Sequence, residues 1–491
     1  MARRYFVTLF FTGLLFVTNL LSAQTERVEA STGFPSSSLD SIRINNNFGG
    51  SLRLGDNLER EFVLVDVFSR HDPLNPVDTT LEPSARWYSF ILTGVKDKAV
   101  LMQFHHSEAQ RPFYAYIDGG MPQPEDFRRF PQEHIMGADR VLGCFDRDSV
   151  MISYFIPYTY EYLQERIRQW SESGKVKVGS AGRSTEGRDM PLLKITDFSV
   201  PDEEKKSVYM HARTHTSEAP CSWHLDFLIS RLLDENNAHS REMLKSIVFH
   251  IVPFANPDGV VNGLSRSNVT GVNQEINWDK AADSTVQEVK NLKQVLDSLY
   301  AVQHVDMSLN LHSQISPYAT YWVHTAESTS ESFFRDEMRL ANLTAYNNIY
   351  MYPEDFSYSS VAPRYVEGWI WNRVGEKTMA ITFETTYVHF SQNPEDEDSE
   401  FPEVSLESLK GLAEHSVMAI GDYFRISTPQ RKLMEPRRRL KLEGGRTYRI
   451  SALLEDGTGG WIPLTEFYCE KDGKKRIRLP ENCETLMVEI L

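Results

Sequence analysis

The central part of the chain alternates between short apolar runs and longer segments with helical periodicity. Between residues 156 and 428, apolar runs of strand length such as 206–212, 246–254 and 306–313 are separated by segments whose apolar side chains recur with the period of a helix. This alternation predicts an α/β domain, in which a mixed, mainly parallel sheet is covered by helices on both faces. In such sheets, ligands are held by strand ends and by the loops that follow them.

Patterns typical of β-strands flank this domain on both sides. Residues 41–155 contain short apolar runs, for example 60–68, interrupted by Pro and Gly, which predicts an antiparallel β-sandwich. Near Arg431 the chain turns basic and then shows further short β runs, which predicts a small β appendage over residues 435–491. An appendage of about sixty residues buries little surface by itself, so we expect it to dock on its neighbour.

The N-terminal residues follow the pattern of an export signal. A basic start precedes an apolar run over residues 5–21, and small residues ending at Ala23 suit cleavage before Gln24. We predict a signal peptide over residues 1–23, a flexible leader over residues 24–40, and export to the periplasm or the extracellular space. An uncleaved membrane anchor is the alternative, which the polar residues within the run disfavour. Since no other long apolar run follows, we expect no stable membrane span after cleavage.

The composition is that of a folded, acidic protein with more than one domain. At 491 residues, with 41% hydrophobic and 24% charged residues, the chain predicts two or three globular domains. A net charge of −16 argues against nucleic acid as a partner, because phosphate binding needs clustered Lys and Arg. Four cysteines are too few for a disulfide-built scaffold. Cys469 and Cys483 either pair in an oxidising compartment or stay as ordinary buried thiols.

Four residues at predicted strand ends have the chemistry of a catalytic zinc site. His215 and Glu218 stand three positions apart where an apolar strand passes into a helix, and His312 ends another apolar strand. Two His and one carboxylate leave a tetrahedral zinc ion with one open position for water, which is the catalytic rather than the structural pattern. Glu384 ends a further apolar strand, and a carboxylate there is costly to bury unless it has a function, such as that of a base.

Several motifs together resemble the zinc metallocarboxypeptidase family. They occur in the family's order and at approximately its spacing, and they are residues 215–218 (HTSE), 256–259 (NPDG), 312–313 (HS) and 382–384 (TFE). The context ARTHTSEAPCSW, with PYTYEYLQ and a β domain ahead of it, looks most like the cytosolic-carboxypeptidase branch. The resemblance covers about residues 40–425 and implies the family's α/β/α fold.

This resemblance implies a role for each residue of the constellation. It implies that His215, Glu218 and His312 bind one zinc ion. It also implies that Glu384 acts as general base and acid, taking a proton from the zinc-bound water and handing it to the leaving amine. Arg266, which follows the NPDG motif, matches the family arginine that stabilises the oxyanion, a step that needs a cation aimed at developing negative charge.

The substrate pocket departs from the family pattern. Most relatives carry an Asn-Arg pair that grips the terminal carboxylate of the substrate, whereas Glu275 and Ile276 occupy those places here. Glu275 would repel a carboxylate, and Ile cannot imitate a bidentate Arg clamp. Either another cation binds the carboxylate, with Arg364 and Arg373 as candidates, or the end of the substrate is not a free carboxylate.

The family also has a mobile tyrosine upstream of the base, and two residues fit that position. Tyr365 and Tyr358 both precede Glu384, and the spacing does not choose between them. We name Tyr365, with Glu275 and Ile276, as the candidate substrate-binding residues.

These features predict an exported hydrolase, a zinc metallocarboxypeptidase that cleaves a peptide or isopeptide bond near the C-terminus of a peptide substrate. The altered pocket keeps open a second enzyme class, a cell-wall peptide amidase or endopeptidase in which Glu275 recognises an amine or amide. A third hypothesis is a peptide-binding protein that holds zinc without turnover. The presence of Glu384 and Arg266 argues against that hypothesis.

Overall fold

The computed structural model divides the chain into two compact units, and each is described by itself. The described residues are 27–54, 58–80, 82–107, 111–302, 304–390, 402–455 and 460–491. The first unit takes its described residues from Met1–Gly33, Leu39–Ser69 and Tyr88–Tyr154, and the second takes them from Phe34–Ser38, Arg70–Trp87 and Phe155–Leu491.

The predicted signal peptide, residues 1–23, lies outside the described residues. Within the described part of the chain, no helix has the length and apolar character needed to cross a membrane.

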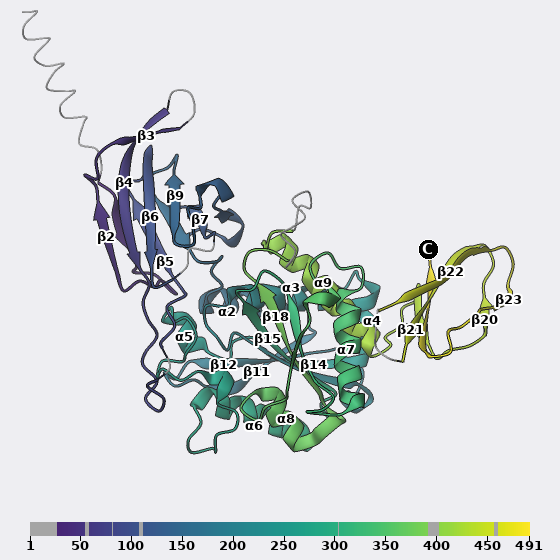
Figure 1. Cartoon of the computed structure of the whole chain (residues 1–491). Helices are drawn as coiled ribbons and strands as arrows, with labels where there is room; N and C mark the ends of the chain where they lie inside the picture. Colours follow the sequence, from purple (N-terminus) through teal and green to yellow (C-terminus); the bar gives the residue numbers. More distant parts are fainter. Residues whose placement is uncertain are drawn as a thin grey trace, which may run out of the picture. The chain divides into compact units, whose positions relative to one another are not determined.

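The first unit contains two β-sheets that pack as a sandwich (Figure 1). One sheet has the order β1 (Glu29–Ser31), β5 (Ser89–Thr93), β10 (Val150–Ser153), β7 (Phe113–Tyr116) and β8 (Arg128–Arg129). The other has the order β2 (Ser41–Asn45), β4 (Leu58–Phe68), β6 (Lys98–His105) and β9 (Arg140–Cys144), with β3 (Ser51–Leu54) paired to β4. Two short 3-10 helices of this unit are η1 (Pro124–Asp126) and η2 (Gln132–His134).

Alternation along the strands explains how these sheets pack. In β4, Val63, Val65 and Val67 are buried, while the residues between them are partly exposed. The ring of Tyr88, which directly precedes β5, lies 4.5 Å from the ring of Phe104 in β6 of the other sheet, measured between centroids. The predicted sandwich is confirmed, with one difference of detail, because β4 and β6 run parallel.

The region predicted as a flexible leader is part of the fold over its described residues. β1 pairs with β5, and the backbone N–H of the buried Val28 donates to the side-chain oxygen of Asn46 at 2.8 Å. Residues 34–38 and 70–87 belong to the second unit, although the pattern places the boundary of the sandwich at 41–155. Burial of Val28 and pairing of β1 explain why this stretch differs from a free leader.

The second unit is built on an eight-stranded mixed sheet. Its order is β11 (Val176–Arg183), β12 (Asp189–Ile195), β14 (Ile247–Val252), β13 (Lys206–Ala212), β15 (Met307–Gln314), β18 (Met379–Thr386), β16 (Thr320–His324) and β17 (Ser357–Ser359). The four central strands, β14, β13, β15 and β18, run parallel to one another, and antiparallel strands join on both sides. The predicted mixed, mainly parallel core is confirmed.

Helices cover both faces of this sheet (Figure 1). On one face, α3 (Ala219–Leu232), α7 (Glu331–Ala345) and α9 (Leu406–Tyr423) pack on one another and on the central strands. On the other face, α6 (Gln287–Val302) and α8 (Val366–Val374) share a core with residues of β12, β13, β14 and β18. The remaining helices are α2 (Tyr160–Ser171), α4 (Ala238–Ser246), α5 (Pro257–Val261), η3 (Asp202–Glu204), η4 (Gln274–Ile276), η5 (Pro353–Asp355) and η6 (Gly375–Lys377).

The C-terminal appendage is a small β domain with its own core. Its four-stranded sheet has the order β19 (Arg431–Met434), β24 (Cys483–Ile490), β21 (Arg446–Leu454) and β22 (Ile462–Cys469), and β20 (Arg439–Leu442) pairs with β23 (Gly473–Arg476) as a separate ribbon. Cys469 and Cys483 are both free thiols, so they do not form a disulfide bond in this structure.

One buried carboxylate joins the appendage to the α/β core. Asp422, in the last turn of α9, accepts a hydrogen bond from the indole N–H of Trp461 at 2.7 Å and pairs with the guanidinium of Arg431. Glu484 of β24 adds ion pairs to Arg339 of α7 at 2.8 Å and to Arg425 at 2.9 Å. The appendage is therefore docked on its neighbour, as its small size predicts.

Candidate active site

The turn between β13 and α3 positions the first two predicted metal ligands. After Ala212, Arg213 adopts a left-handed backbone conformation with a φ of 60°. The buried guanidinium of Arg213 donates to the carbonyl of Thr216 at 2.8 Å and to the hydroxyl of Ser222 at 3.0 Å. These bonds hold the turn in place, and they leave Glu218 at the N-cap of α3, where the helix dipole favours a carboxylate.

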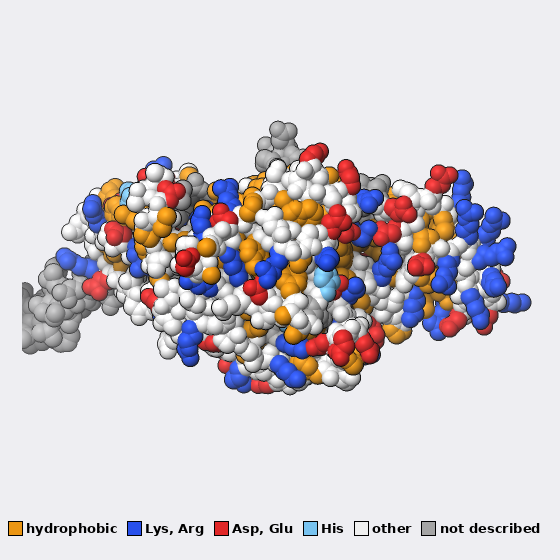
Figure 2. Space-filling model, turned by 90° about the horizontal axis from the view of Figure 1, so that it is seen from below, with side chains coloured by type: hydrophobic (Ala, Val, Ile, Leu, Met, Phe, Trp, Pro, Cys, Tyr) orange, Lys and Arg blue, Asp and Glu red, His pale blue; other side chains and the backbone are white. Residues whose placement is uncertain are grey.

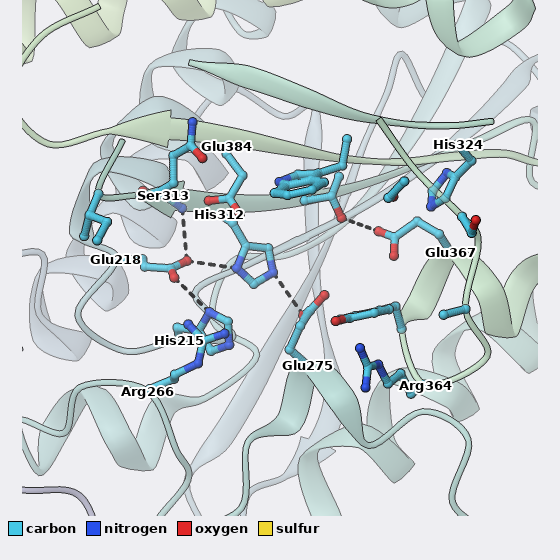
Figure 3. A pocket seen from close by; sticks show the side chains of 18 of the residues that line it. His215, Glu218, Arg266, Glu275, His312, Ser313, His324, Arg364, Glu367 and Glu384 are labelled. Atoms are coloured by element: carbon cyan, nitrogen blue, oxygen red, sulfur yellow. Dashed lines mark hydrogen bonds and ion pairs between the residues drawn. The ribbon is translucent and has the colours of Figure 1, made fainter. Parts of the chain in front are cut away.

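The three predicted metal ligands come together in one buried cluster (Figure 3). His215 Nδ1 lies 2.8 Å from Glu218 Oε1, and His312 Nδ1 lies 2.9 Å from Glu218 Oε2. The three ligand atoms all lie within 4.8 Å of one another. The backbone N–H of Ser313 donates to Glu218 Oε2 at 3.0 Å, which fixes the carboxylate against the end of β15.

The outer hydrogen bonds of the two imidazoles aim their inner nitrogens at a common point. His215 Nε2 lies 3.0 Å from the side-chain oxygen of Asn273, and His312 Nε2 lies 3.0 Å from Glu275 Oε2. Each imidazole thus lies between two acceptors, with Nδ1 facing Glu218 and Nε2 facing Asn273 or Glu275. With a cation at the centre of the cluster, the proton of each neutral imidazole would stay on Nε2, and the Nδ1 lone pairs would face the ion. Two such nitrogens and one carboxylate form the ligand set of a catalytic zinc ion.

The electrostatics of the cluster also fit a cation. Burial lowers the pKa of His312, but the carboxylates of Glu275 and Glu218 on either side outweigh it and raise this pKa well above its usual range. The cluster therefore favours positive charge at its centre, and a divalent ion supplies that charge with the imidazoles neutral.

Glu384 lies beside the cluster on the neighbouring strand. β15 and β18 run parallel with His312 opposite Glu384, so the pairing of the strands places the predicted base next to a ligand. Glu384 Oε2 is buried and makes no hydrogen bond with any described residue. Burial, together with the carboxylate of Glu218, raises the pKa of Glu384 to about 7, and a cation bound beside it would lower this pKa. An unpartnered, poised carboxylate suits proton transfer.

Arg266 lies in the same cavity, on a loop held by a residue from far earlier in the chain. Asp72, which is 5% exposed, accepts hydrogen bonds from the backbone N–H groups of Ser265 at 2.7 Å, Arg266 at 2.7 Å and Ser267 at 2.8 Å. Asp72 belongs to the segment 70–87, which is part of the second unit. Sequence reasoning missed Asp72, because no motif or local spacing links it to a loop almost two hundred positions later.

One cavity of about 450 Å³ contains most of the predicted site. The predicted residues that line it are His215, Glu218, Arg266, Glu275, His312, Tyr365 and Glu384. Among the described residues, Ile276 and Tyr358 are not part of this lining. Ile276 is therefore not placed in the pocket, and Tyr365 fits the position of the mobile tyrosine better than Tyr358, whose side chain is exposed.

The structure gives Glu275 a different partner from the predicted one. The interpretation from the sequence is a contact with a substrate amine or amide. Instead, Glu275 Oε2 accepts from His312 Nε2, and Glu275 Oε1 accepts from the side-chain amide of Asn310 at 3.0 Å. Because η4 directs this carboxylate toward β15, Glu275 holds the metal ligand His312 in place. The sequence alone does not show in which direction the Glu275 side chain points. Asn273, two positions earlier, braces His215 in the same way.

The pocket beyond the cluster contains one acid that sequence reasoning missed and one cation that it named. Glu367 of α8 is 4% exposed, and its Oε1 accepts from the hydroxyl of Thr382 at 2.5 Å and from Asn310 at 3.3 Å. Burial, together with the carboxylate of Glu275, raises the pKa of Glu367. The sequence feature that could have indicated Glu367 is an acidic residue in the first, largely apolar turn of a helix.

Arg364 also lines this cavity, with its guanidinium 5.0 Å from the ring centroid of Tyr365. Within the described chain, no carboxylate forms an ion pair with Arg364. Arg373, the other predicted candidate, pairs with Asp297 at 2.6 Å and is not part of the cavity lining among the described residues. Arg364 is therefore the candidate that the fold brings to the site.

A buried His–Glu–His cluster at the carboxyl ends of parallel strands, with a carboxylate and an arginine beside it, defines a zinc-dependent metallopeptidase. The profile of the zinc carboxypeptidases matches residues 160–407, about half of the chain, and the chain belongs to this family. The family is zinc-dependent and consists of hydrolases, so zinc is the cofactor that the cluster takes.

Individual relatives agree with this family. A cytosolic carboxypeptidase 6 from Mus musculus is 25% identical over 323 residues, which cover 60% of this chain and 57% of the relative. A protein of uncharacterised function from Zymomonas mobilis is 25% identical over 230 residues, which cover 46% of this chain and 58% of the relative. The chain thus spans little more than half the length of these curated relatives.

The solved structure of a metallo-carboxypeptidase from Burkholderia cenocepacia has the same fold. It superimposes with a TM-score of 0.63 at 20% identity and covers 81% of this chain and 99% of that chain. The predicted family and the predicted fold class are both confirmed.

Proposed function

We propose that the protein is an exported zinc carboxypeptidase that removes a residue from the C-terminus of a peptide. The single observation that carries this proposal is the meeting of the His215–Glu218–His312 cluster with Glu384 and Arg266 in one cavity. When bound, zinc would lower the pKa of a water molecule to about 7 and polarise the substrate carbonyl. His215, Glu218 and His312 would hold the ion.

The chain's own groups then divide the work of the reaction. Glu384 Oε2, which has no partner in the described part of the chain, accepts the proton of the attacking water, and Glu384 later gives this proton to the leaving amine. The guanidinium of Arg266 lies in the same cavity and stabilises negative charge as it develops on the carbonyl oxygen. Burial of the cluster keeps bulk water away, so these charges act in a medium of low dielectric constant.

Arg364 replaces the missing arginine as the group that binds the terminal carboxylate. It is a cation in the cavity, and within the described chain no carboxylate forms an ion pair with it. Its planar guanidinium lies over the ring of Tyr365, 5.0 Å from the centroid, and can form two parallel hydrogen bonds to a carboxylate. This arrangement favours cleavage at a free C-terminus.

A second candidate function is an amidase or endopeptidase that acts on wall peptides carrying an extra amine. The observation in its favour is Glu367, a buried carboxyl group that lines the cavity. An ammonium group of the substrate would pair with this carboxylate. Glu275 is not needed for this recognition, because both of its oxygens already accept hydrogen bonds.

One experiment separates the two candidates. We expect hydrolysis of a free-acid peptide to be much faster than that of its C-terminal amide, with product masses that show removal of the last residue. Arg364→Gln should raise KM for the free acid about tenfold or more, since it removes a charge-assisted hydrogen bond.

Arg373→Gln is the matched control and should leave KM unchanged, because Arg373 pairs with Asp297 instead. Equal cleavage of acid and amide, with no effect of Arg364→Gln and a large loss in Glu367→Gln, would favour the amidase. Zinc binding without hydrolysis of any peptide in a library would support a non-catalytic binding protein.

Export is the remaining element of the proposal and rests on the pattern of residues 1–23. Expression of the full chain with its N-terminal segment should yield a secreted or periplasmic protein whose intact mass corresponds to a start at Gln24. A cytoplasmic product of full mass would contradict it.

A further inference from the structure

The C-terminal appendage carries a concentrated positive surface that the proposed function does not use. We define the basic ribbon as the exposed cations of β20, β23 and the residue before β20, namely Arg438, Arg439, Lys441, Lys474, Lys475 and Arg476. Figure 2 shows Lys and Arg side chains gathered on the appendage, at the right of the view. The whole chain has a net charge of −16, so this clustering differs from its average composition.

The pairing of the two strands sets like charges against each other. Arg439 is directly opposite Arg476, and Lys441 is directly opposite Lys474. Directly opposed side chains on neighbouring strands lie about 5 Å apart at their Cβ atoms, and like charges in such positions are destabilising. The ribbon therefore carries repulsion that a bound polyanion would relieve.

The other face of the ribbon explains why it keeps its shape despite this repulsion. Leu440 and Leu442 of β20, and Ile477 just after β23, are buried in the core of the appendage. Because side chains alternate along a strand, burial of these residues turns Arg439, Lys441 and Arg476 outward. The cations are thus presented on a fixed scaffold, which reduces the entropy lost on binding.

Acidic residues nearby do not neutralise the ribbon. Glu443 pairs with Arg446 at 3.0 Å, and Glu466 pairs with Arg449 at 3.0 Å. Among the described residues, no carboxylate forms an ion pair with any cation of the basic ribbon. The ammonium group of Lys475 lies 4.4 Å from the ring centroid of Phe467, and the charge of the two cross-strand pairs is available for an external partner.

From this surface we propose that the basic ribbon docks the protein on a membrane that contains anionic phospholipids. Each Lys or Arg held near such a surface adds to the attraction, so the four outward cations of the two cross-strand pairs act together. The acidic remainder of the chain is repelled by the same surface, which leaves the ribbon as the contact. Neither β20 nor β23 carries an aromatic residue for base stacking, so single-stranded nucleic acid fits this surface less well.

Vesicle co-sedimentation of the full-length protein tests the proposal. We expect binding to vesicles of phosphatidylglycerol and phosphatidylcholine, and none to vesicles of phosphatidylcholine alone. Raising the ionic strength from about 0.05 M to about 0.3 M should release the protein, because screening shortens the range of the attraction. Replacing both cross-strand pairs by Gln should weaken binding at least about tenfold. These four changes are Arg439→Gln, Lys441→Gln, Lys474→Gln and Arg476→Gln.

A control with the same loss of charge separates the ribbon from net charge. It removes four exposed cations elsewhere in the second unit, and they are Arg241, Lys245, Lys280 and Lys410, each changed to Gln. This control should bind the vesicles like the original protein. The pair Arg439→Lys and Arg476→Lys keeps the charge and should bind too, which shows that binding depends on the charge. An unchanged thermal unfolding midpoint of the four-Gln variant excludes a folding defect as the cause of lost binding.

Three results would overturn the proposal. They are absence of binding to anionic vesicles, equal weakening in the control, and tighter binding to a DNA oligonucleotide than to vesicles. Peptide hydrolysis should be unchanged in all variants, because the ribbon is not part of the catalytic cavity, so the test does not depend on the proposed reaction.

Discussion

The metal cluster and the substrate pocket line one cavity, but they differ in how their polar atoms are satisfied. In the cluster, each ring nitrogen of His215 and His312 and each oxygen of Glu218 lies within 3.0 Å of a polar partner. In the pocket, the buried Glu384 Oε2 has no hydrogen-bond partner among the described residues, and the exposed Arg364 forms no ion pair with any of them. An unsatisfied buried group is costly, so Glu384 Oε2 indicates where water or substrate binds, and Arg364 offers a positive charge in the same cavity.

This difference divides the site into two sets of groups. The held groups are the metal ligands His215, Glu218 and His312, and the acting groups, such as Glu384 and Arg364, contact water or substrate. The held groups need fixed geometry, and the protein supplies it through Asn273, Glu275 and the backbone of Ser313. The acting groups need room to gain and lose partners during a reaction. Substitutions of the held groups should therefore weaken metal binding, whereas substitutions of the acting groups should slow turnover.

The largest effect is expected at the acting carboxylate. Glu384→Gln should lower kcat about a thousandfold, because an amide cannot accept and return the proton. The variant should still bind one zinc ion, since Glu384 is not one of the three ligands. Steady-state kinetics with zinc analysis by mass spectrometry checks both statements. A variant that loses zinc along with activity would show that Glu384 belongs to the held set.

Removal of the metal should act on the held set. With a chelator, the free energy of unfolding should fall by about 4 kcal/mol relative to protein with zinc in thousandfold excess over its Kd. The buried carboxylates of Glu218 and Glu275 then lose their compensating cation. Thermal unfolding with and without chelator measures the change. Glu384→Gln should show the same loss, whereas His215→Ala should show almost none, because it has little zinc to lose.

Sequence reasoning finds the cluster more readily than the pocket, for physical reasons. His215, Glu218, His312 and Glu384 are close in sequence or end neighbouring strands, and parallel pairing brings strand ends together. Two β domains and an α/β core follow equally well from apolar periodicity. The direction of the Glu275 side chain depends on η4, and a three-residue helix has no such pattern.

Long-range contacts are harder still to predict. Asp72 reaches the Arg266 loop because residues 70–87 belong to the second unit and not to the sandwich. The apolar pattern of this segment does not indicate which part of the fold it contacts. The same holds for residues 34–38. Where a segment is fixed by hydrogen bonds to distant backbone, the local sequence carries little information about its place.

Asp72 provides the next sharpest test, because it holds an acting group without touching substrate. Asp72→Asn should lower kcat about tenfold to a hundredfold with little change in KM, since loss of the N–H contacts lets Arg266 drift from the developing oxyanion. Kinetics of Asp72→Asn in an Arg266→Gln background separates positioning from general stability. There the second change should have almost no further effect on kcat. Additive losses in the double variant would contradict the positioning role.

A loss of similar size is expected at Glu275, but in zinc affinity instead of turnover, and it shows whether this residue braces a metal ligand or contacts substrate. Glu275→Ala should weaken zinc binding about tenfold to a hundredfold, because His312 Nε2 loses its acceptor. Glu275→Gln keeps an oxygen for that bond but meets the amide of Asn310 with a second donor, so we expect an intermediate loss of about tenfold or less. Competition with a chelator of known affinity measures both. If Glu275 instead contacts substrate, both variants would change KM while zinc affinity stays the same, and Glu275 would then join Arg364 and Glu384 among the acting groups.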